Sequence, residues 1–410
     1  MTLPSCRFCG TLLRHVFVDL GMSPLCESFL SAQELNRMEP FYPLKVWVCD
    51  RCFLVQLQEY VSPAEIFTEY AYFSSYSTSW LAHARAYADM ATQRFALGSA
   101  SRVVEIASND GYLLQYFVEK GIPVLGVEPA ANVAKAAIER GVPTVVRFFG
   151  RQTAAELSRD NGQADLIVGN NVLAHVPDIN DFVAGLAVLL APSGVITMEF
   201  PHLLRLIEGN QFDTIYHEHF SYLSFLTVRD IFAAHGLRLF DVEELATHGG
   251  SIRIFACHDG DGRPTEPRAQ ALAAAEQEQG FRSLDRYLSF APRVHETKRA
   301  LLDVLIDARN KGRSIAGYGA PGKGNTLLNY CGIRTDFLDY TVDRNPYKHG
   351  KYLPGTHIPI FAPEKLRETR PDFVFLLPWN LEAEIVEQLS YVREWGGQFI
   401  VPIPRVTIRR

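Results

Sequence analysis

Two Cys-x-x-Cys pairs near the N-terminus, Cys6 with Cys9 and Cys49 with Cys52, constrain the fold of this chain more than any other feature. Each pair can present two sulfurs to one point, and structural Zn²⁺ favours a closed shell of four such ligands. A segment of about 60 residues has too little core to be stable without a staple. We therefore predict a small zinc-binding domain over residues 1–62, with two unrelated turns or a redox pair as the alternatives.

The rest of the composition is typical of a folded protein from a reducing compartment. The chain has 410 residues, 47% hydrophobic and 21% charged, with seven cysteines and a formal net charge of −6. No secretory signal precedes Cys6, and Cys26, Cys257 and Cys331 lack a pairing pattern, so we expect those three to be buried as apolar residues. Because no long basic or unbroken apolar segment occurs, we expect a cytoplasmic protein that binds neither nucleic acid nor a membrane.

From residue 102 onward, strand-like and helix-like segments alternate, which is typical of a parallel sheet covered by helices on both faces. Ser62 and Pro63 are suited to begin a helical leader over 63–98. We place this α/β domain at residues 63–260 and expect its last two strands to form an antiparallel pair. The expected strands are 103–106, 124–127, 165–168, 195–199, 237–242 and 251–257, and the expected helices are 111–121, 133–140 and 182–190.

A second α/β pattern occupies the C-terminal part of the chain, over residues 261–410. It begins with a charged, Ala/Glu/Gln-rich stretch at 262–312 that is predicted to be helical. The fold class is therefore α/β, with two sheet domains behind a small N-terminal one. The expected strands of the second sheet are 314–318, 337–342, 373–377 and 398–401, with a helix over 381–392.

The first predicted strand of the middle domain ends in an acidic loop. Glu105 closes the strand, and a turn of small and polar residues leads into the next helix, so a ligand can approach the backbone and the helix N-terminus. About 20 residues later Glu128 ends the second strand, where a carboxylate suits a ribose diol. The loop is not Gly-x-Gly-x-x-Gly, which disfavours a dinucleotide. The predicted cofactor-binding residues at these two strand ends are Glu105, Ala107, Asn109, Asp110, Gly111, Glu128 and Pro129.

This arrangement resembles class I methyltransferases that bind S-adenosylmethionine. The resemblance implies that the first loop receives the methionine end of the cofactor and that Glu128 holds the ribose. It also implies that Asn170 and Asn171, after the fourth strand, lie along the cofactor. A plain α/β domain with an acidic strand end is the alternative.

Titratable side chains cluster in Tyr216-His217-Glu218-His219, after the fifth-strand region, and at His175, after the fourth strand. Both segments follow the carboxyl ends of parallel strands, where open α/β sheets build their sites. A histidine beside a carboxylate can remove a proton from a carbon next to a ketone, and Tyr or a second His can donate to the enolate oxygen. A packed, hydrogen-bonded turn is the alternative. The spacing is not His-Glu-x-x-His, so we predict no second metal.

A glycine-rich loop, Gly-Tyr-Gly-Ala-Pro-Gly-Lys-Gly-Asn-Thr, occupies residues 317–326 between a predicted strand and a predicted helix. It has the form of an anion-binding turn, with backbone N–H groups, a helix N-terminus and one lysine. Gly324 follows the lysine, so the Walker pattern of ATP hydrolysis is absent. We predict that Tyr318, Lys323 and Asn325 bind the diphosphate of a nucleotide-linked substrate; a tight turn for close helix packing is the alternative.

Taken together, the paired cysteines, Asn-Asn-Val-Leu-Ala-His at 170–175, the Tyr-His-Glu-His segment and the glycine-rich loop resemble the sugar C-methyltransferases of deoxysugar biosynthesis. The resemblance covers essentially the whole chain. It implies a zinc-binding domain, a class I S-adenosylmethionine-dependent methyltransferase domain with a Rossmann-like sheet, and a second, C-terminal Rossmann-like domain. It also implies methylation of the carbon beside the ketone in a nucleotide-linked 4-keto-6-deoxy sugar.

By the same resemblance, His219 is the general base, and Glu218 orients or supports it. His175, Tyr216 and Tyr70 would line the sugar and stabilise the enolate, although the aromatic stretch around Tyr70 could equally be a packed lid. Two other functions stay open at this point: methylation of oxygen or nitrogen on a small metabolite, and a non-catalytic zinc-knuckle binding protein. We expect a monomer, because three domains can complete one cleft.

Overall fold

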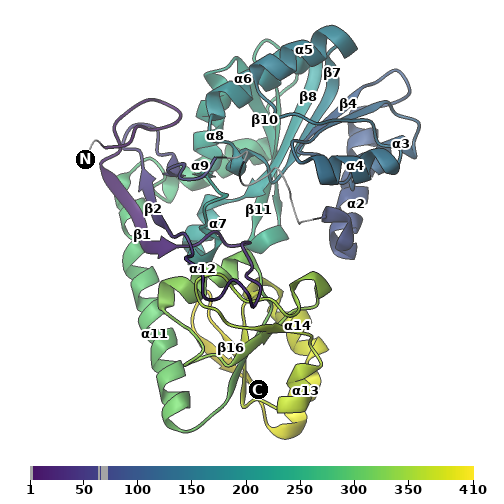
Figure 1. The fold of residues 1–410 in the computed structure, drawn as a ribbon. Coiled ribbons are helices and arrows are strands. Elements are labelled where there is room, and N and C mark those ends of the chain that lie inside the picture. Colours follow the sequence, from purple (N-terminus) through teal and green to yellow (C-terminus); the bar gives the residue numbers. More distant parts are fainter. Residues whose placement is uncertain (1–2, 63–64, 66–72) are drawn as a thin grey trace. The chain divides into compact units, whose positions relative to one another are not determined.

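The computed structural model describes residues 3–62, 65 and 73–410, and its internal contacts group the chain into two compact units (Figure 1). The two units and the three predicted domains divide the chain differently, so the division into three domains stays a prediction. The first unit comprises residues 1–14, 49–202 and 220–283, and the second comprises residues 15–48, 203–219 and 284–410.

The first unit is built on a seven-stranded sheet in the order β10-β11-β8-β7-β4-β5-β6. Strands β4 to β8 run parallel, and β11 and β10 join antiparallel at one edge, which confirms the predicted closing pair. The strand order reverses between β4 and β7, and ligands bind at such a reversal in open α/β sheets.

Local signals in the sequence explain where several helices of this unit begin. The Ser77 hydroxyl accepts a hydrogen bond from the backbone of Trp80, and Asp178 and Ser224 cap α6 and α8 in the same way. The elements of the first unit are β3 (Val55–Leu57), η1 (Ser74–Tyr76), α2 (Thr78–Arg94), β4 (Val103–Ile106), α3 (Leu114–Val118), β5 (Val124–Val127), α4 (Ala131–Glu139), β6 (Thr144–Val145), α5 (Arg151–Asn161), β7 (Ala164–Asn170), η2 (Leu173–His175), α6 (Ile179–Leu189), β8 (Leu190–Pro201), β9 (Ser221–Tyr222), α8 (Phe225–Ala233), β10 (Leu237–Leu245), η4 (Thr247–Gly249), β11 (Ser251–His258) and α9 (Pro267–Glu278).

The second unit is built on a six-stranded sheet in the order β14-β13-β12-β15-β16-β17. Its first five strands are parallel, and β17 is antiparallel to β16. The order reverses between β12 and β15, immediately beside the glycine-rich loop. The observed parallel core agrees with the second α/β pattern that the sequence predicted.

The N-terminal hairpin of β1 and β2 belongs to the second unit and packs beside its long helix, α11 (Figure 1). Phe17 stacks on Phe290, with the ring centroids 4.6 Å apart. The elements of the second unit are β1 (His15–Ser23), β2 (Tyr42–Val48), α7 (Leu203–Glu208), η3 (Phe212–Thr214), α10 (Leu284–Leu288), α11 (Phe290–Asn310), β12 (Ile315–Tyr318), α12 (Gly322–Cys331), β13 (Tyr340–Val342), η5 (Pro346–Lys348), β14 (Ile360–Phe361), α13 (Lys365–Thr369), β15 (Phe373–Leu376), η6 (Trp379–Leu381), α14 (Glu382–Gln388), η7 (Ser390–Trp395), β16 (Gln398–Val401) and β17 (Thr407–Arg409).

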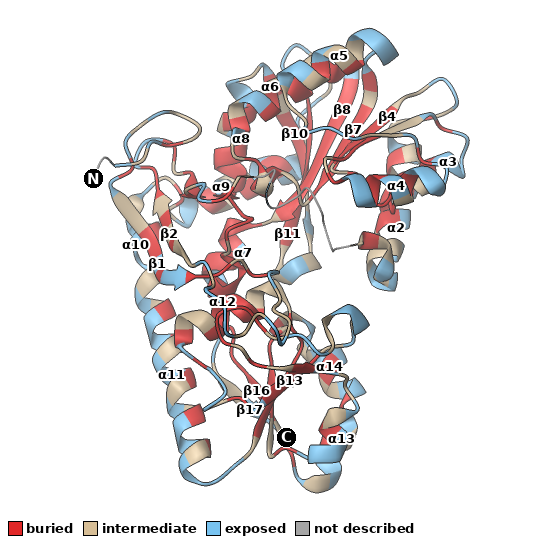
Figure 2. Ribbon diagram, viewed as in Figure 1, coloured by how far each residue is buried: buried red, intermediate tan, exposed pale blue. Residues whose placement is uncertain are grey.

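Burial follows the two sheets, whose central strands are red in Figure 2. In the first unit, one face of the sheet is covered by α2 and α3, whose buried side chains include Tyr87 and Phe117. Cys26, Cys257 and Cys331 are all buried, as predicted. In the described part of the chain, no helix has the length and apolarity needed to cross a bilayer.

Several predicted boundaries were too generous. The helix expected over 111–121 is reduced to α3, because Gly111, with a φ of 76°, and the turn after it occupy the first positions. The strand expected over 337–342 begins only at Tyr340, and the helix expected over 381–392 is divided into α14 and η7. Helices α5 and α8 were not predicted.

The helical leader expected over 63–98 is observed in part. Residues 63–64 and 66–72 lie outside the described part of the chain, and the described helix α2 begins at Thr78. Ser62 and Glu65 form the reciprocal bonds of a capping box: the backbone N–H of Ser62 donates to Glu65 Oε2 at 3.0 Å, and that of Glu65 donates to Ser62 Oγ at 3.3 Å.

Candidate functional site

The four predicted zinc ligands, Cys6, Cys9, Cys49 and Cys52, come together in the first unit. Their sulfur atoms all lie within 4.8 Å of one another, and none of the four forms a disulfide. The Gln56 amide donates to Cys6 Sγ at 3.2 Å. Such a donor stabilises a thiolate, which is the form that binds a metal, so the donor set fits a closed Zn²⁺ site.

The two cysteine turns have the same backbone geometry, although 39 residues separate them. In the first, the N–H of Gly10 donates to the carbonyl of Cys6 at 2.9 Å; in the second, the N–H of Phe53 donates to the carbonyl of Cys49 at 3.0 Å. Gly10 and Phe53 both have left-handed backbone angles, with φ of 73° and 58°. Phe53 is a residue type that rarely adopts this conformation, so its strain points to a functional constraint, which a metal-binding turn supplies.

The predicted cofactor loop is strained where it meets the carboxyl ends of the strands. Ala107, Asn109 and Asn171 all have positive φ, between 49° and 57°. Such angles are rare outside glycine and gather where the surroundings impose them, as at ligand sites. The sequence places Ala107 and Asn109 in the predicted loop after the first strand and Asn171 after the fourth strand, but it carries no signal for their conformation.

Glu128 holds this loop through two backbone N–H groups. Its carboxylate accepts hydrogen bonds from Asn109 and from Ala130, both at 2.9 Å. Burial raises the pKa of Glu128, although these two hydrogen bonds act against the rise. Pro129 lies between the carboxylate and its second donor, so the predicted residues around Glu128 are brought together.

The other predicted cofactor residues present buried oxygen atoms at this edge of the sheet. The side-chain oxygens of Asn170 and Asn171, and Oδ1 of Asp110, accept no hydrogen bond from the described residues. Glu105 is fully buried, and this burial raises its pKa well above the usual range. Buried acceptors of this kind fit a polar cofactor that carries an ammonium group and hydroxyl groups.

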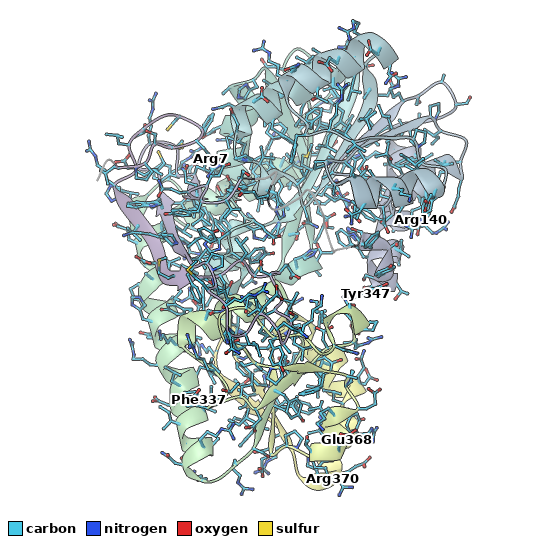
Figure 3. The ribbon with its side chains drawn as sticks, viewed as in Figure 1. Arg7, Arg140, Phe337, Tyr347, Glu368 and Arg370 are labelled. Atoms are coloured by element: carbon cyan, nitrogen blue, oxygen red, sulfur yellow. The ribbon has the colours of Figure 1, made fainter. Side chains whose placement is uncertain are left out.

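A clamp on Asp110 was not predicted. Arg140, at the end of α4 (Figure 3), donates to the Asp110 carboxylate at 2.8 Å and to its carbonyl at 3.0 Å. The Ser75 hydroxyl of η1 contacts the same carboxylate, and Ser74 donates its N–H to the Asn109 side chain at 2.9 Å. The residues that precede α2 therefore pack directly on the cofactor loop.

A second polar cluster that sequence reasoning missed lies at the end of the neighbouring strand, β8. Glu199 is fully buried and accepts from His83 at 2.8 Å, from Arg253 at 2.6 Å and from Thr247 at 3.0 Å. Burial acts to raise the pKa of Glu199, but His83 and Arg253 outweigh it and hold that pKa below the usual value. The backbone N–H of Asn171 donates to the Glu199 carbonyl at 2.7 Å, so the cluster adjoins the cofactor loop.

The Tyr-His-Glu-His segment belongs to the second unit. His219 Nδ1 lies 2.9 Å from the carbonyl oxygen of Thr214, which can only accept a hydrogen bond. Nδ1 therefore carries the ring proton, and in the neutral imidazole the lone pair is on Nε2. This tautomer is the form in which a histidine acts as a base through Nε2.

The neighbours of His219 are also held in place. The Tyr216 ring lies against His219, with centroids 4.0 Å apart, and His217 Nε2 lies 3.3 Å from the Pro43 carbonyl. Glu218 is buried and accepts a hydrogen bond from the Cys26 thiol at 3.7 Å. Burial, together with the charge of Glu27, raises the pKa of Glu218 to about 7.

The remaining predicted catalytic residues are separate from this segment in the chain. His175 ends η2, directly after β7 of the first unit, and is half-buried. Tyr70 lies outside the described residues.

The glycine-rich loop joins β12 to α12 in the second unit, as predicted, but its polar residues do not share one surface. Tyr318 lines two cavities, of about 180 and 480 Å³, whereas Lys323 and Asn325 line neither of them. Lys323 donates to the side-chain oxygen of Asn380 at 2.9 Å, and Asn325 is buried. A phosphate-binding role for these two residues stays a prediction.

The two cavities share residues and lie at the carboxyl ends of β12 and β13. Sequence reasoning missed their cationic residues, Arg344, Lys348 and Arg367, because they lie beyond the motif. The side chains that line both cavities are Tyr318, Arg344 and Gln388; the smaller cavity adds Gly319, Pro321, Asp343, Lys348, Pro378, Leu381, Glu384 and Ile385, and the larger adds His349, Pro363, Glu364, Arg367, Leu389 and Tyr391.

Comparison with known families divides the chain into three matching segments. Residues 6–67 match a family described as a putative zinc binding domain, and residues 80–242 match one described as a methyltransferase domain. Residues 246–404 match the C-methyltransferase C-terminal domain.

The chain is 37% identical to the C-methyltransferase NovU of Streptomyces niveus over 402 residues, which are 98% of this chain and 96% of that protein. It is 27% identical over 98 residues to a ubiquinone biosynthesis O-methyltransferase of Rhodopseudomonas palustris, which covers 24% of this chain and 38% of that protein. Among solved structures, magnesium protoporphyrin IX methyltransferase of Synechocystis PCC 6803 with bound SAH matches 43% of this chain and 83% of its own, at 13% identity and a TM-score of 0.35.

The fold, the four-cysteine site and the full-length similarity agree with one another. The protein is an enzyme with a class I methyltransferase domain, and its cofactors are S-adenosylmethionine and structural Zn²⁺. The chain therefore belongs to the family of S-adenosylmethionine-dependent C-methyltransferases that includes NovU.

Proposed function

We propose that this C-methyltransferase acts on a nucleotide-linked 4-keto-6-deoxy sugar and methylates the carbon beside the ketone. The observation that carries the proposal is the hydrogen bond from His219 Nδ1 to the Thr214 carbonyl, because it leaves Nε2 as the basic nitrogen. A carbon acceptor must lose a proton as it gains a methyl group, so this reaction needs such a base. The full-length similarity to the C-methyltransferase NovU supports carbon as the acceptor atom.

In the proposed reaction, His219 Nε2 takes the proton from the carbon beside the ketone, and the electrons of that C–H bond form an enolate. S-adenosylmethionine supplies the methyl group as a sulfonium. The enolate carbon forms the new C–C bond as the C–S bond breaks, and the ketone is restored. The proton leaves from His219 to solvent. His175, Tyr216 and Tyr70 would line the sugar and donate to the enolate oxygen, and Glu218 would support the base.

The cofactor and the nucleotide would be held by the loops of the two sheets. Glu105, Asp110, Asn170 and Asn171 would offer acceptors to the methionine end of the cofactor, and Glu128 would bind its ribose. We further propose that the nucleotide diphosphate lies in the two cavities that Tyr318 and Arg344 line, where Lys348, Arg367 and Tyr391 add two more cations and a second aromatic ring. A monomeric cytoplasmic enzyme with three domains completes the proposal.

The test uses the full chain and a panel of TDP- and GDP-linked 4-keto-6-deoxy sugars in deuterium oxide. Wild type should exchange the proton beside the ketone and, with S-adenosylmethionine, produce a product that is 14 mass units heavier, with the methyl on carbon. His219→Asn should lower both rates by roughly 100-fold or more, since a general base contributes about 10²–10⁴-fold.

The matched control is His258→Gln, a histidine of β11 whose Nε2 lies 3.2 Å from the Leu190 carbonyl oxygen. It should exchange and methylate like wild type. If His219→Asn exchanges at the wild-type rate, His219 is not the base. A methyl group found on oxygen or nitrogen would instead contradict the assigned reaction.

A further inference from the structure

The first turns of α12, which contain the predicted phosphate-binding residues Lys323 and Asn325, hold the backbone that leads into His219. The Thr326 hydroxyl donates to the carbonyl of Ile215 at 2.9 Å. Ile215 directly follows Thr214, whose carbonyl accepts from His219 Nδ1. One hydroxyl of α12 is therefore bonded to the peptide unit next to the one that orients the base.

Asp213, the residue before Thr214, provides a second link. It is fully buried, and its Oδ2 accepts from the Trp379 indole N–H at 2.6 Å. Lys323 lies 5.2 Å from the centre of the Trp379 ring and donates to Asn380, the next residue of η6. Burial raises the pKa of Asp213 to about 6, while the charge of Lys323 acts in the opposite direction.

The same residues adjoin the cavity proposed for the nucleotide. Gly319 and Pro321, immediately before α12, line the smaller cavity, and Pro378 and Leu381, on either side of Trp379 and Asn380, line it as well. The residues at the N-terminal end of α12 and those of η6 therefore lie next to the cavity and also contact residues 213–215. All of these contacts lie within the second unit.

We propose that Thr326, Trp379 and Lys323 are positioning residues that connect the nucleotide cavity to the base His219. They act through Asp213 and the Ile215 carbonyl, and none of them needs to touch the substrate. The inference rests on the proposed function, since it requires His219 to be the base. It gives the lysine of the glycine-rich loop an architectural role in place of a phosphate contact.

The experiment compares variants that delete one hydrogen bond each while retaining shape: Thr326→Val and Trp379→Phe. Both should lower kcat for solvent deuterium exchange by roughly 10- to 100-fold, because a small displacement of a catalytic group has costs of that order. The Kd for thymidine diphosphate and for guanosine diphosphate, measured by calorimetry, should stay within about twofold of wild type, because the cavity lining is unchanged.

Two matched controls separate positioning from simple loss of packing. Thr326→Ser keeps the hydroxyl and should restore exchange to near the wild-type rate. Trp395→Phe removes another indole N–H of the same unit, which donates to the Pro371 carbonyl at 3.0 Å, and should leave exchange unaffected. If Trp379→Phe does not fold, the Thr326→Val and Thr326→Ser pair decides the question alone.

Lys323→Met distinguishes the two roles of the lysine. In a positioning role, kcat for exchange falls and the affinity for the diphosphates is retained. A 10-fold or greater loss of diphosphate affinity with unchanged kcat would overturn the inference in favour of phosphate binding. Wild-type exchange in both Thr326→Val and Trp379→Phe would overturn it too. His219→Asn is run in parallel: exchange by that variant refutes the proposed function itself, whereas loss of exchange there with normal exchange in the others refutes only the positioning role.

Discussion

In each of the two sheets, a carboxylate at the end of the second strand in chain order accepts two backbone hydrogen bonds, but the surroundings of the two carboxylates differ. In the first unit, Glu128 accepts from the N–H of Asn109 in the preceding loop and from that of Ala130 two residues on, both at 2.9 Å. In the second unit, Asp343 accepts from Ala320 at 2.7 Å and from Asn345 at 2.8 Å in the corresponding positions. One carboxylate fixes the first loop of each sheet.

The surroundings of the two carboxylates show how one scaffold can serve two tasks. The loop at Glu128 is strained, and the side-chain oxygens of Asn170 and Asn171 beside it lack protein donors among the described residues. The loop that Asp343 holds contains Ala320 and leads directly into α12. In that helix, Lys323 is bonded to Asn380 and Thr326 to the Ile215 carbonyl. The first loop thus offers its polar groups to a ligand, whereas the second uses them to hold a neighbouring segment.

The largest expected difference between the units concerns the metal, because the four-cysteine site belongs to the first unit alone. Removing Zn²⁺ with a chelator, or replacing Cys49 by Ser, should raise hydrogen exchange around 6–11 and 49–57 on the order of 100-fold, since binding free energy of a structural zinc is also folding free energy. Strands β12 and β15 should keep their protection. Equal loss of protection in both sheets would show that the metal stabilises the whole molecule.

Replacing Glu128 or Asp343 should weaken the binding of a different ligand in each unit. Glu128→Ala leaves two N–H groups without their acceptor and should weaken binding of S-adenosylhomocysteine by roughly 10- to 100-fold, while diphosphate binding is kept. Asp343→Ala should weaken diphosphate binding by a similar factor, while binding of S-adenosylhomocysteine is kept. Calorimetry with S-adenosylhomocysteine and thymidine diphosphate on both variants measures the four affinities. If each variant weakened both ligands equally, the two loops would not be separate sites.

A further expected difference concerns two buried glutamates, Glu218 and Glu199, whose pKa values are shifted in opposite directions. Glu218 has a pKa of about 7, so the folded state holds a proton that the unfolded state releases above about pH 4.5. Stability of the second unit should therefore fall as pH rises from about 4.5 to about 7, by up to about 3 kcal/mol, and Glu218→Gln should reduce this fall.

The pKa of Glu199 is shifted in the opposite direction, because His83 and Arg253 lower it. Its contribution to stability is present above its unfolded pKa and is lost as pH falls through the lower folded value. Glu199→Gln should therefore reduce the acid sensitivity of the first unit. Hydrogen exchange read in β8 at pH 5 and at about pH 3 measures the slope from Glu199, and exchange read in β12 at pH 5 and pH 8 measures the slope from Glu218. The same slope in both variants and wild type would contradict the assignment.

Features encoded in short segments could be predicted from the sequence, and features that depend on distant residues could not. The two cysteine pairs and the parallel strands each follow from a local pattern, and both are confirmed. The loop at Glu105 follows from a local pattern too, and its role in cofactor binding stays a prediction. The cluster around Glu199 was missed because its partners are distant in the chain: His83 lies 116 residues before Glu199, and Arg253 lies 54 residues after it. No periodicity or motif marks such a cluster.

Lys323, in the glycine-rich loop, shows in another way that a local pattern does not predict contacts with distant residues. Its spacing suggests a phosphate contact, but that pattern contains no information about Asn380, more than fifty positions later, to which Lys323 is bonded. Tyr318, in contrast, ends a predicted strand, and the position of a strand end at the edge of a parallel sheet already places it beside the cavities. Backbone position was predictable there, and side-chain direction was not.

The way in which the two units share the chain affects how the enzyme is made. With unit borders after residues 14, 48, 202, 219 and 283, the chain passes from one unit to the other five times. Residues 203–219, which carry His219, leave the ribosome before residues 284–410, and synthesis proceeds at about 5–20 residues per second. The segment that bears the proposed base must therefore wait several seconds for the sheet and for helix α12, which bonds to its backbone. A chain ending at 283 would contain the histidine and lack every residue of α12 that orients it.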